Sequence, residues 1–191
     1  MKSMTTSLSH LILAGTLLVG CAGAMEEVNA QAEQKLNDLE IAHIAYTAGA
    51  IDIRYAHLAL GLSEDPEVRA FAELMIRDHT AVNNKALALV KKLNITPQDN
   101  ATSRQLSQQA SQIRNELVQL RGEAFAKRYA ANELGYHQTV NNVVEHTFIP
   151  NAENAELKAL LTSALQTFKV HEGHAKRMNE KLATAMNDPK M

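Results

Sequence analysis

Three histidines occupy positions where a helical repeat would place an apolar side chain. His79 and His171 each stand between two apolar residues at helical spacing, and His137 lies three residues before Val140. An imidazole buried without a partner costs on the order of 1–3 kcal/mol. Neutral imidazole is also the commonest protein ligand for zinc, copper, nickel and iron. The histidines therefore require a shared partner inside the fold.

Asp52 adds a carboxylate to the same interior, because it shares a helix face with Ala48 and Tyr55. Each of four expected helices then carries one potential metal ligand, and these are Asp52, His79, His137 and His171. At about 1.5 Å per residue, three of them lie roughly 15–21 Å from the bundle end that holds the first and third turns. On this count His171 lies deeper, at roughly 25–30 Å. Clustering is expected, with His171 offset by about a turn or more.

Two solutions satisfy such a cluster, and the sequence leaves both open. One is a bound divalent transition metal, with zinc, copper, nickel and iron as candidates. The other is a metal-free polar network in which tyrosines are the partners, namely Tyr55, Tyr129 or Tyr136. Gly49, Gly135 and Gly173 lie near the candidate ligands, either to leave space for a site or to let the helices pack closely.

Second-rank ligands stand beside these positions, and they are Asp78, Glu133, Glu172 and His174. Asp78 adjoins His79 and suits a supporting hydrogen bond to a ligand ring. His171 and His174 are three residues apart, one short of the zinc-protease motif, but a pair at this spacing can chelate one ion from a single helix face. The sequence has no Ser or Cys nucleophile signature, no Gly-rich phosphate loop and no core Glu-x-x-His motif of di-iron proteins. An enzyme is the less favoured class.

The elements that position these residues are helices. Apolar residues recur at three- and four-residue steps over 41–62, 68–93, 106–143 and 157–182, and Asp65-Pro66 is a helix start signal. The chain is rich in Ala and Leu, has 4% aromatic residues and only four prolines, which argues against a β-sandwich. Short connections predict an all-α, up-down-up-down four-helix bundle over residues 38–187, with the third helical region bent or split near Gly122. A net charge of −2 gives no electrostatic basis for binding nucleic acid.

The N-terminus has the pattern of an export signal. Residues 1–20 combine Lys2 with an apolar run too short to span a bilayer. The run ends Leu18-Val19-Gly20-Cys21, which resembles the lipobox of bacterial lipoproteins. We expect lipid on Cys21, a tether over residues 21–37, and anchoring in the inner leaflet of the outer membrane, facing the periplasm. The alternative is an ordinary signal peptide cleaved after Ala24 or Ala30, which would leave a soluble periplasmic protein.

Several of these residues together resemble a family. They are the run Asp65-Pro66-Glu67-Val68-Arg69-Ala70-Phe71-Ala72, followed by Met75, Asp78-His79, Phe125, Tyr129, His137, His171 and Ala175. This pattern is similar to that of a widespread bacterial family of exported proteins of unknown function, and it covers residues 38–186. The resemblance implies a ferritin-like bundle with Asp52, His79, His137 and His171 as polar core positions, and it implies no activity. The chain departs from the family at Asp52, where Glu is usual, at Ala126 and at Gln166.

The sequence thus favours a lipid-anchored periplasmic bundle that binds a divalent transition metal for sensing, buffering or envelope stress. The alternative is a metal-free structural or protein-interaction module of the cell envelope, built around a buried His/Tyr/Asp network. The sequence leaves the protein partner and the oligomeric state open.

Overall fold

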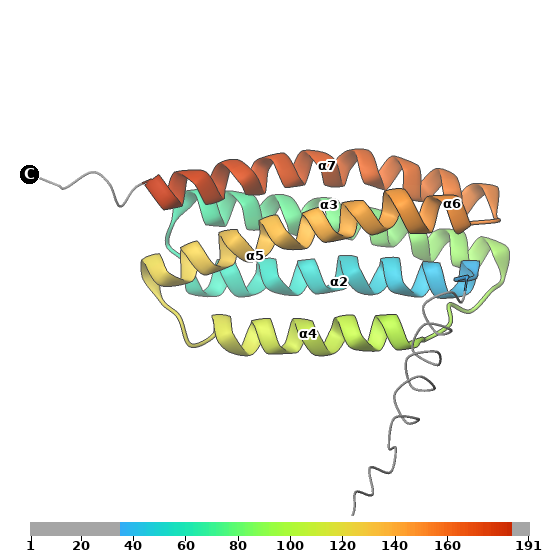
Figure 1. Ribbon diagram of the computed structural model, residues 1–191, viewed down its shortest axis with the longest axis horizontal. Coiled ribbons are helices and arrows are strands. Elements are labelled where there is room, and N and C mark those ends of the chain that lie inside the picture. Colours follow the sequence, from blue (N-terminus) through green and yellow to red (C-terminus); the bar gives the residue numbers. More distant parts are fainter. Residues whose placement is uncertain (1–34, 185–191) are drawn as a thin grey trace, which may run out of the picture. The chain divides into compact units, whose positions relative to one another are not determined.

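The computed structural model describes residues 35–184, and this part of the chain consists of helices and turns. Its five long helices are α2 (Asp38–Leu62), α3 (Pro66–Leu93), α4 (Ala101–Leu117), α5 (Gly122–Val143) and α7 (Ala155–Thr184) (Figure 1). A π-helical turn, η1 (Val144–Phe148), and the short α6 (Ile149–Asn151) extend α5. The expected signal peptide, Cys21 and most of the tether lie outside the described residues. Within those residues, no helix has the length and hydropathy needed to cross a membrane.

Local capping signals set where the helices begin. Asp65 accepts hydrogen bonds from the backbone of Glu67 and Val68, and Pro66 is the first residue of α3, as the sequence predicts. Asn154 accepts from the backbone N–H groups of Glu156 and Leu157, and so caps α7. These bonds satisfy amide groups that have no partner inside the helix.

The third predicted region is two helices, because the chain reverses at Gly122. Arg121 is extended, and Gly122 has φ +54°, a left-handed conformation that interrupts the helix. α4 runs in the same direction as α2, and after the reversal α5 runs in the same direction as α3 (Figure 1). The split near Gly122 is confirmed. Consecutive long helices alternate in direction, but the described residues form five of them, so α3 and α5 run parallel (Figure 1). α2 and α3 form one antiparallel pair, α5 and α7 form another, and α4 is the connection between the pairs.

The apolar core has two parts, one towards each end of the bundle. One contains Tyr55, Phe71, Met75, Leu117, Phe125 and Tyr129, and the other contains Ile41, Ile44, Val144, Phe148, Leu157 and Leu161. In α3, α5 and α7 the candidate histidines fall between the segments that supply these two parts. The polar residues thus form a layer within an otherwise apolar interior.

Gly122→Ala should destabilise the fold by about 1–2 kcal/mol, because an L-residue with a side chain is strained in the left-handed region. An added methyl group meets no atom within 4 Å there, so the backbone alone causes the loss. Gly61→Ala is the matched control, because it also meets no atom within 4 Å and lies in the last turn of α2 with no positive φ. It should be neutral or stabilising by up to about 1 kcal/mol. Urea denaturation measures both, and equal effects would contradict the assignment.

Candidate metal centre

The four first-rank residues come from four helices and lie at one level of the bundle. Counted from the end at which α2 and α7 begin, each lies about 14–16 residues along its helical segment, or roughly 21–24 Å. His171 is therefore level with the others, and the predicted offset is wrong. The turns before α3 and before α7 lie at opposite ends of the bundle, because α4 adds a reversal that the sequence count omitted (Figure 1).

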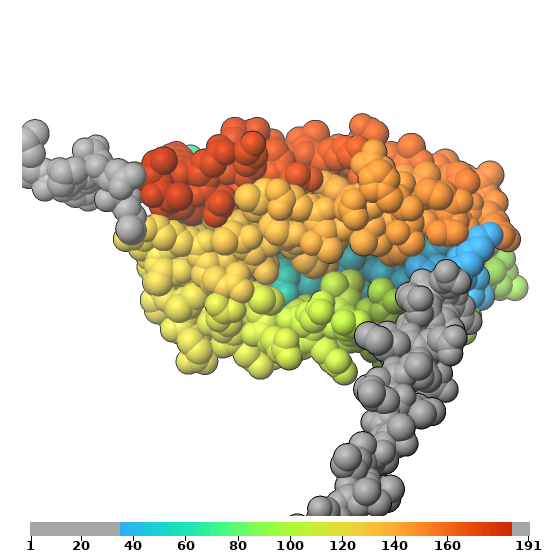
Figure 2. Space-filling model, in the orientation of Figure 1, coloured from blue at the N-terminus to red at the C-terminus, as the bar shows by residue number. Residues whose placement is uncertain are grey.

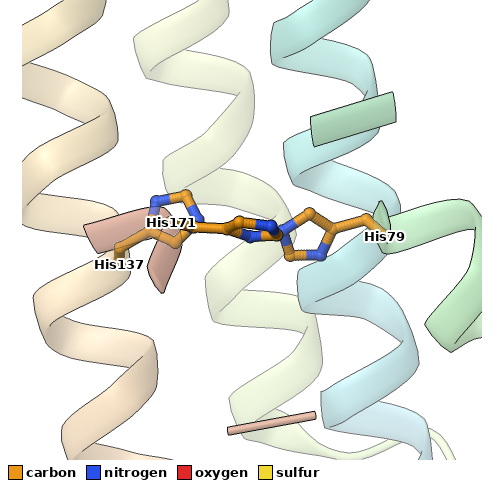
Figure 3. Close-up of side chains that lie close together, drawn as sticks. All are labelled: His79, His137 and His171. Carbon is orange, nitrogen blue, oxygen red and sulfur yellow. The ribbon is translucent and has the colours of Figure 1, made fainter. Parts of the chain in front are cut away.

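Two of the three histidine rings contact the carboxylate of Asp52, and the third ring lies beside them. Nε2 of His79 lies 3.0 Å from Oδ2 of Asp52, and Nε2 of His137 lies 3.3 Å from the same oxygen. The ring of His171 lies 5.2 Å from that of His79 and 5.6 Å from that of His137, centroid to centroid (Figure 3). One nitrogen from each of the three rings lies within 4.8 Å of the other two. All four residues are at most 3% exposed, so the cluster is buried.

Two of the rings are fixed by a hydrogen bond from one nitrogen, which leaves the other nitrogen free. His137 donates its Nδ1–H to the backbone oxygen of Glu133 at 2.9 Å. His171 donates its Nε2–H to Oδ2 of Asp78 at 2.9 Å. Because each acceptor is an oxygen without a proton, the lone pairs lie on Nε2 of His137 and Nδ1 of His171. The third ring, His79, stacks on Phe168 at 4.7 Å with an interplanar angle of 13°.

Several polar atoms of the cluster have no hydrogen-bond partner among the described residues. They are both carboxylate oxygens of Asp52, both ring nitrogens of His79, Nε2 of His137, Nδ1 of His171 and Oε2 of Glu133. The contacts between Asp52 and the rings are short but do not have hydrogen-bond geometry. Buried polar atoms without partners are costly, and such a group of nitrogen and oxygen atoms is what a transition-metal ion requires.

Comparison with known proteins places the chain in a family. A family model described as a domain of unknown function, DUF4142, matches residues 23–178. The chain belongs to the DUF4142 family. This confirms the resemblance to a helical family of unknown function. No curated protein matches the sequence of this DUF4142 chain.

A solved structure has a similar fold. "CopM in the Cu(II)-bound form" superposes with a TM-score of 0.59 over 77% of this chain and 98% of that chain. The two sequences are 13% identical, so the likeness concerns the fold.

The second-rank residues of this DUF4142 protein separate into two groups. Asp78 holds His171, and Oε2 of Glu133 lies 3.8 Å from Nδ1 of His137. Glu133 also belongs to a second buried group that could hold an ion, with Asp52 and His137. In contrast, Glu172 accepts a hydrogen bond from Asn141, and His174 is exposed. The structure does not bring these two residues into the cluster.

The tyrosines do not form the predicted network. Tyr136 donates its hydroxyl to the backbone oxygen of Ala48, and Tyr55 donates to that of Ala110. The hydroxyl of Tyr129 has no hydrogen-bond partner among the described residues. None of the three hydroxyls bonds to a histidine or to Asp52. A tyrosine network therefore does not account for the buried polar atoms.

Burial and mutual charge set the protonation states of the cluster. Burial alone would raise the pKa of Asp52, but His79 and His137 hold it below its usual value. Burial lowers the pKa of His137, and it lowers the pKa of His171 to about 4 in spite of the bond to Asp78. Burial, together with the charge of Asp52, raises the pKa of Glu133 well above its usual value. Near pH 7 the cluster thus holds the carboxylate of Asp52 and the neutral imidazoles of His137 and His171, which are the forms that bind metals.

Sequence reasoning missed one polar residue beside the site. Asn83 is buried one helical turn after His79, and both line the same cavity. The four-residue spacing to His79 was the available signal, because it places both side chains on one face of α3. Asn83 indicates that the polar layer continues towards the end of the bundle at which α3 terminates.

Proposed function

We propose that this protein binds one divalent transition-metal ion through His79, His137, His171 and Asp52. The observation that carries the proposal is the convergence of three buried imidazoles, each on its own helix, beside a carboxylate that contacts two of them and whose oxygens have no hydrogen-bond partner among the described residues. Three imidazoles and one carboxylate form a donor set suited to zinc, copper, nickel or iron. Among these ions, Cu(II) forms the tightest complexes with nitrogen and oxygen donors.

Each residue has a distinct role in this proposal. His137 supplies Nε2 and His171 supplies Nδ1, since their other nitrogens are already bonded. Asp52 supplies negative charge that offsets part of the charge of the ion. Asp78 orients the ring of His171 from the partly exposed edge of the site, where Arg77 also bonds to it. A carboxylate behind a ligand histidine is a common supporting arrangement in metal sites.

The cellular role is also part of the proposal. We place the protein on the periplasmic side of the outer membrane, held by lipid on Cys21, where it senses or buffers a metal or responds to envelope stress. The paired helices α2–α3 and α5–α7 would form a ferritin-like four-helix core around the ion. Support comes from the lipobox-like sequence, the buried histidine site and the fold shared with a protein solved in a Cu(II)-bound form.

Metal analysis of protein purified without a tag tests the proposal. The wild type should hold close to one ion per chain after loading with Cu(II) and desalting. His79→Ala should lose at least tenfold in affinity, because the site then lacks one of its three nitrogens. His174→Ala is the matched control, since this exposed histidine lies outside the cluster, and it should retain the wild-type affinity. A wild type that binds none of the four metals, or equal loss in both variants, would refute the site.

A further inference from the structure

A cavity of about 500 Å³ adjoins the histidine layer. Asp52, His79 and His137 lie at one end of it, and aliphatic side chains make up most of the remaining lining, among them Val82, Leu89, Val140, Val143, Leu161 and Ala164. Its walls come from all five long helices and η1. The volume falls in the range of about 300–1,000 Å³ that is typical of small-molecule sites.

The cavity reaches the surface between α4 and α5. Figure 2 shows a hollow there, with α2 visible at its floor. Polar residues of the flanking helices belong to the lining on this side, including Gln105 and Gln109 of α4 and Thr139 of α5. A molecule can therefore reach the apolar interior through a polar rim.

Asn83 provides the independent observation that the cavity takes a ligand with a polar group. Its side chain is 7% exposed, lines the cavity and makes no hydrogen bond to another described residue. The amide packs closely against Gly49, where an added Cβ would lie 2.5 Å from Oδ1 of Asn83. The amide faces the cavity, so a molecule that displaces water there has to supply its hydrogen bond or leave it without a partner. Its donors and acceptor remain available to a molecule in the cavity.

The charge of the cavity selects the class of that molecule. None of the described residues that line the cavity is a lysine or an arginine, so a buried anion such as a fatty-acid carboxylate would have no cationic side chain to pair with. Aliphatic walls favour a hydrocarbon body. We propose that the cavity binds one neutral, apolar small molecule with a single hydrogen-bonding group, such as a long-chain alcohol, whose polar group bonds to Asn83.

Fluorescence of N-phenyl-1-naphthylamine, a neutral apolar dye, tests this proposal on the purified protein. We expect saturable binding of one dye per chain, displacement by 1-decanol, and at least tenfold weaker displacement by decanoate. The measurement is made on metal-free and on metal-loaded protein, with metal content determined in parallel. Because the cavity is formed by the apolar walls, dye binding is expected in the metal-free protein, and a failure of the metal proposal would leave this result standing.

Matched substitutions on α3 locate the binding. Ala86 lines the cavity, whereas Ala88 is exposed and does not. Ala86→Phe should weaken dye binding at least tenfold, and Ala88→Phe should leave it unchanged, with circular dichroism reporting the fold of each. Asn83→Leu should keep dye binding and lower the affinity for 1-decanol several-fold, which tests the polar contact without filling the cavity.

Three results would overturn the proposal. The first is the absence of saturable dye binding by the wild type. The second is an equal effect of Ala86→Phe and Ala88→Phe in folded proteins. The third is displacement by decanoate that is as strong as displacement by 1-decanol, which would contradict a neutral ligand.

Discussion

Saturation with Cu(II) should raise the free energy of unfolding by about 4 kcal/mol when the free ion exceeds its Kd a thousandfold. Asp52→Asn should remove most of this gain. Asp52 is the fully buried carboxylate in contact with both His79 and His137, and its asparagine analogue keeps the shape but loses the charge. Urea denaturation with and without the ion measures the difference.

The same substitution should have a small effect in the absence of metal. An ionised carboxylate that is buried without hydrogen bonds is costly, so replacing it with a neutral amide should leave the metal-free protein equally stable or more stable. Loss of metal-dependent stabilisation without loss of metal-free stability separates a ligand from a purely structural residue. Glu64→Gln makes the same charge change at an exposed position and should retain the full gain. An undiminished gain in Asp52→Asn would exclude Asp52 from the site.

The stability of the metal-free protein should be greatest near pH 6.5, where two unfolded histidines together hold about as many protons as folded Glu133 keeps, and it should fall on both sides. On the acid side, burial lowers the pKa of His137 and lowers that of His171 to about 4. Both histidines take up protons near pH 6.5 when unfolded, so the unfolded state binds up to two more protons between about pH 6.5 and 4.5. Glu133 has the opposite effect. Its raised pKa keeps it protonated in the folded state, so the folded state binds one proton there that the unfolded state has released. The net difference of one proton corresponds to a loss of about 2–3 kcal/mol from pH 6.5 to 4.5.

On the alkaline side, only Glu133 binds a different number of protons in the two states, because His137 and His171 are then neutral in both. The folded state keeps its proton while the unfolded state has lost it, so stability falls by up to about 1.4 kcal/mol per pH unit until Glu133 ionises in the fold. Glu133→Gln should abolish this alkaline decline and steepen the acid one. Urea denaturation between about pH 4.5 and 8.5 measures both slopes. Glu180→Gln, at an exposed position, is the control and should follow the wild-type profile. A wild-type profile that is flat from pH 7 to 5 would contradict buried, neutral histidines.

The sequence by itself determined the helices and the residues that face their interior. Both depend on interactions within a few residues along the chain. The three- and four-residue repeat placed Asp52, His79, His137 and His171 inwards, and all four are buried. Asp65 and Pro66 set the start of α3 through bonds that span no more than three residues. The lipidation of Cys21 stays a prediction, because that residue lies outside the described part.

Only the tertiary structure decided how these elements are joined and which side chains meet. The chain reverses between Leu117 and Gly122, so the region that the sequence predicts as bent or split is two helices, and the course of the rest of the chain is reversed. The predicted levels of Asp52 and His79 were nevertheless close to correct, since both lie near the middle of their helices and are almost equally far from either end. The level of His171 was counted from the start of α7, which lies at the opposite end of the bundle from the start of α3, and it was wrong.

The contacts that complete the site join residues far apart in the chain. His171 bonds to Asp78 across 93 residues, and the hydroxyl of Tyr136 bonds to Ala48 across 88. Helical periodicity gives the face on which a residue lies, but it carries no information about which helix that face meets or at what height. The sequence therefore identified the ligand types, and the packing of α2, α3, α5 and α7 decided that they form one site with a cavity beside it.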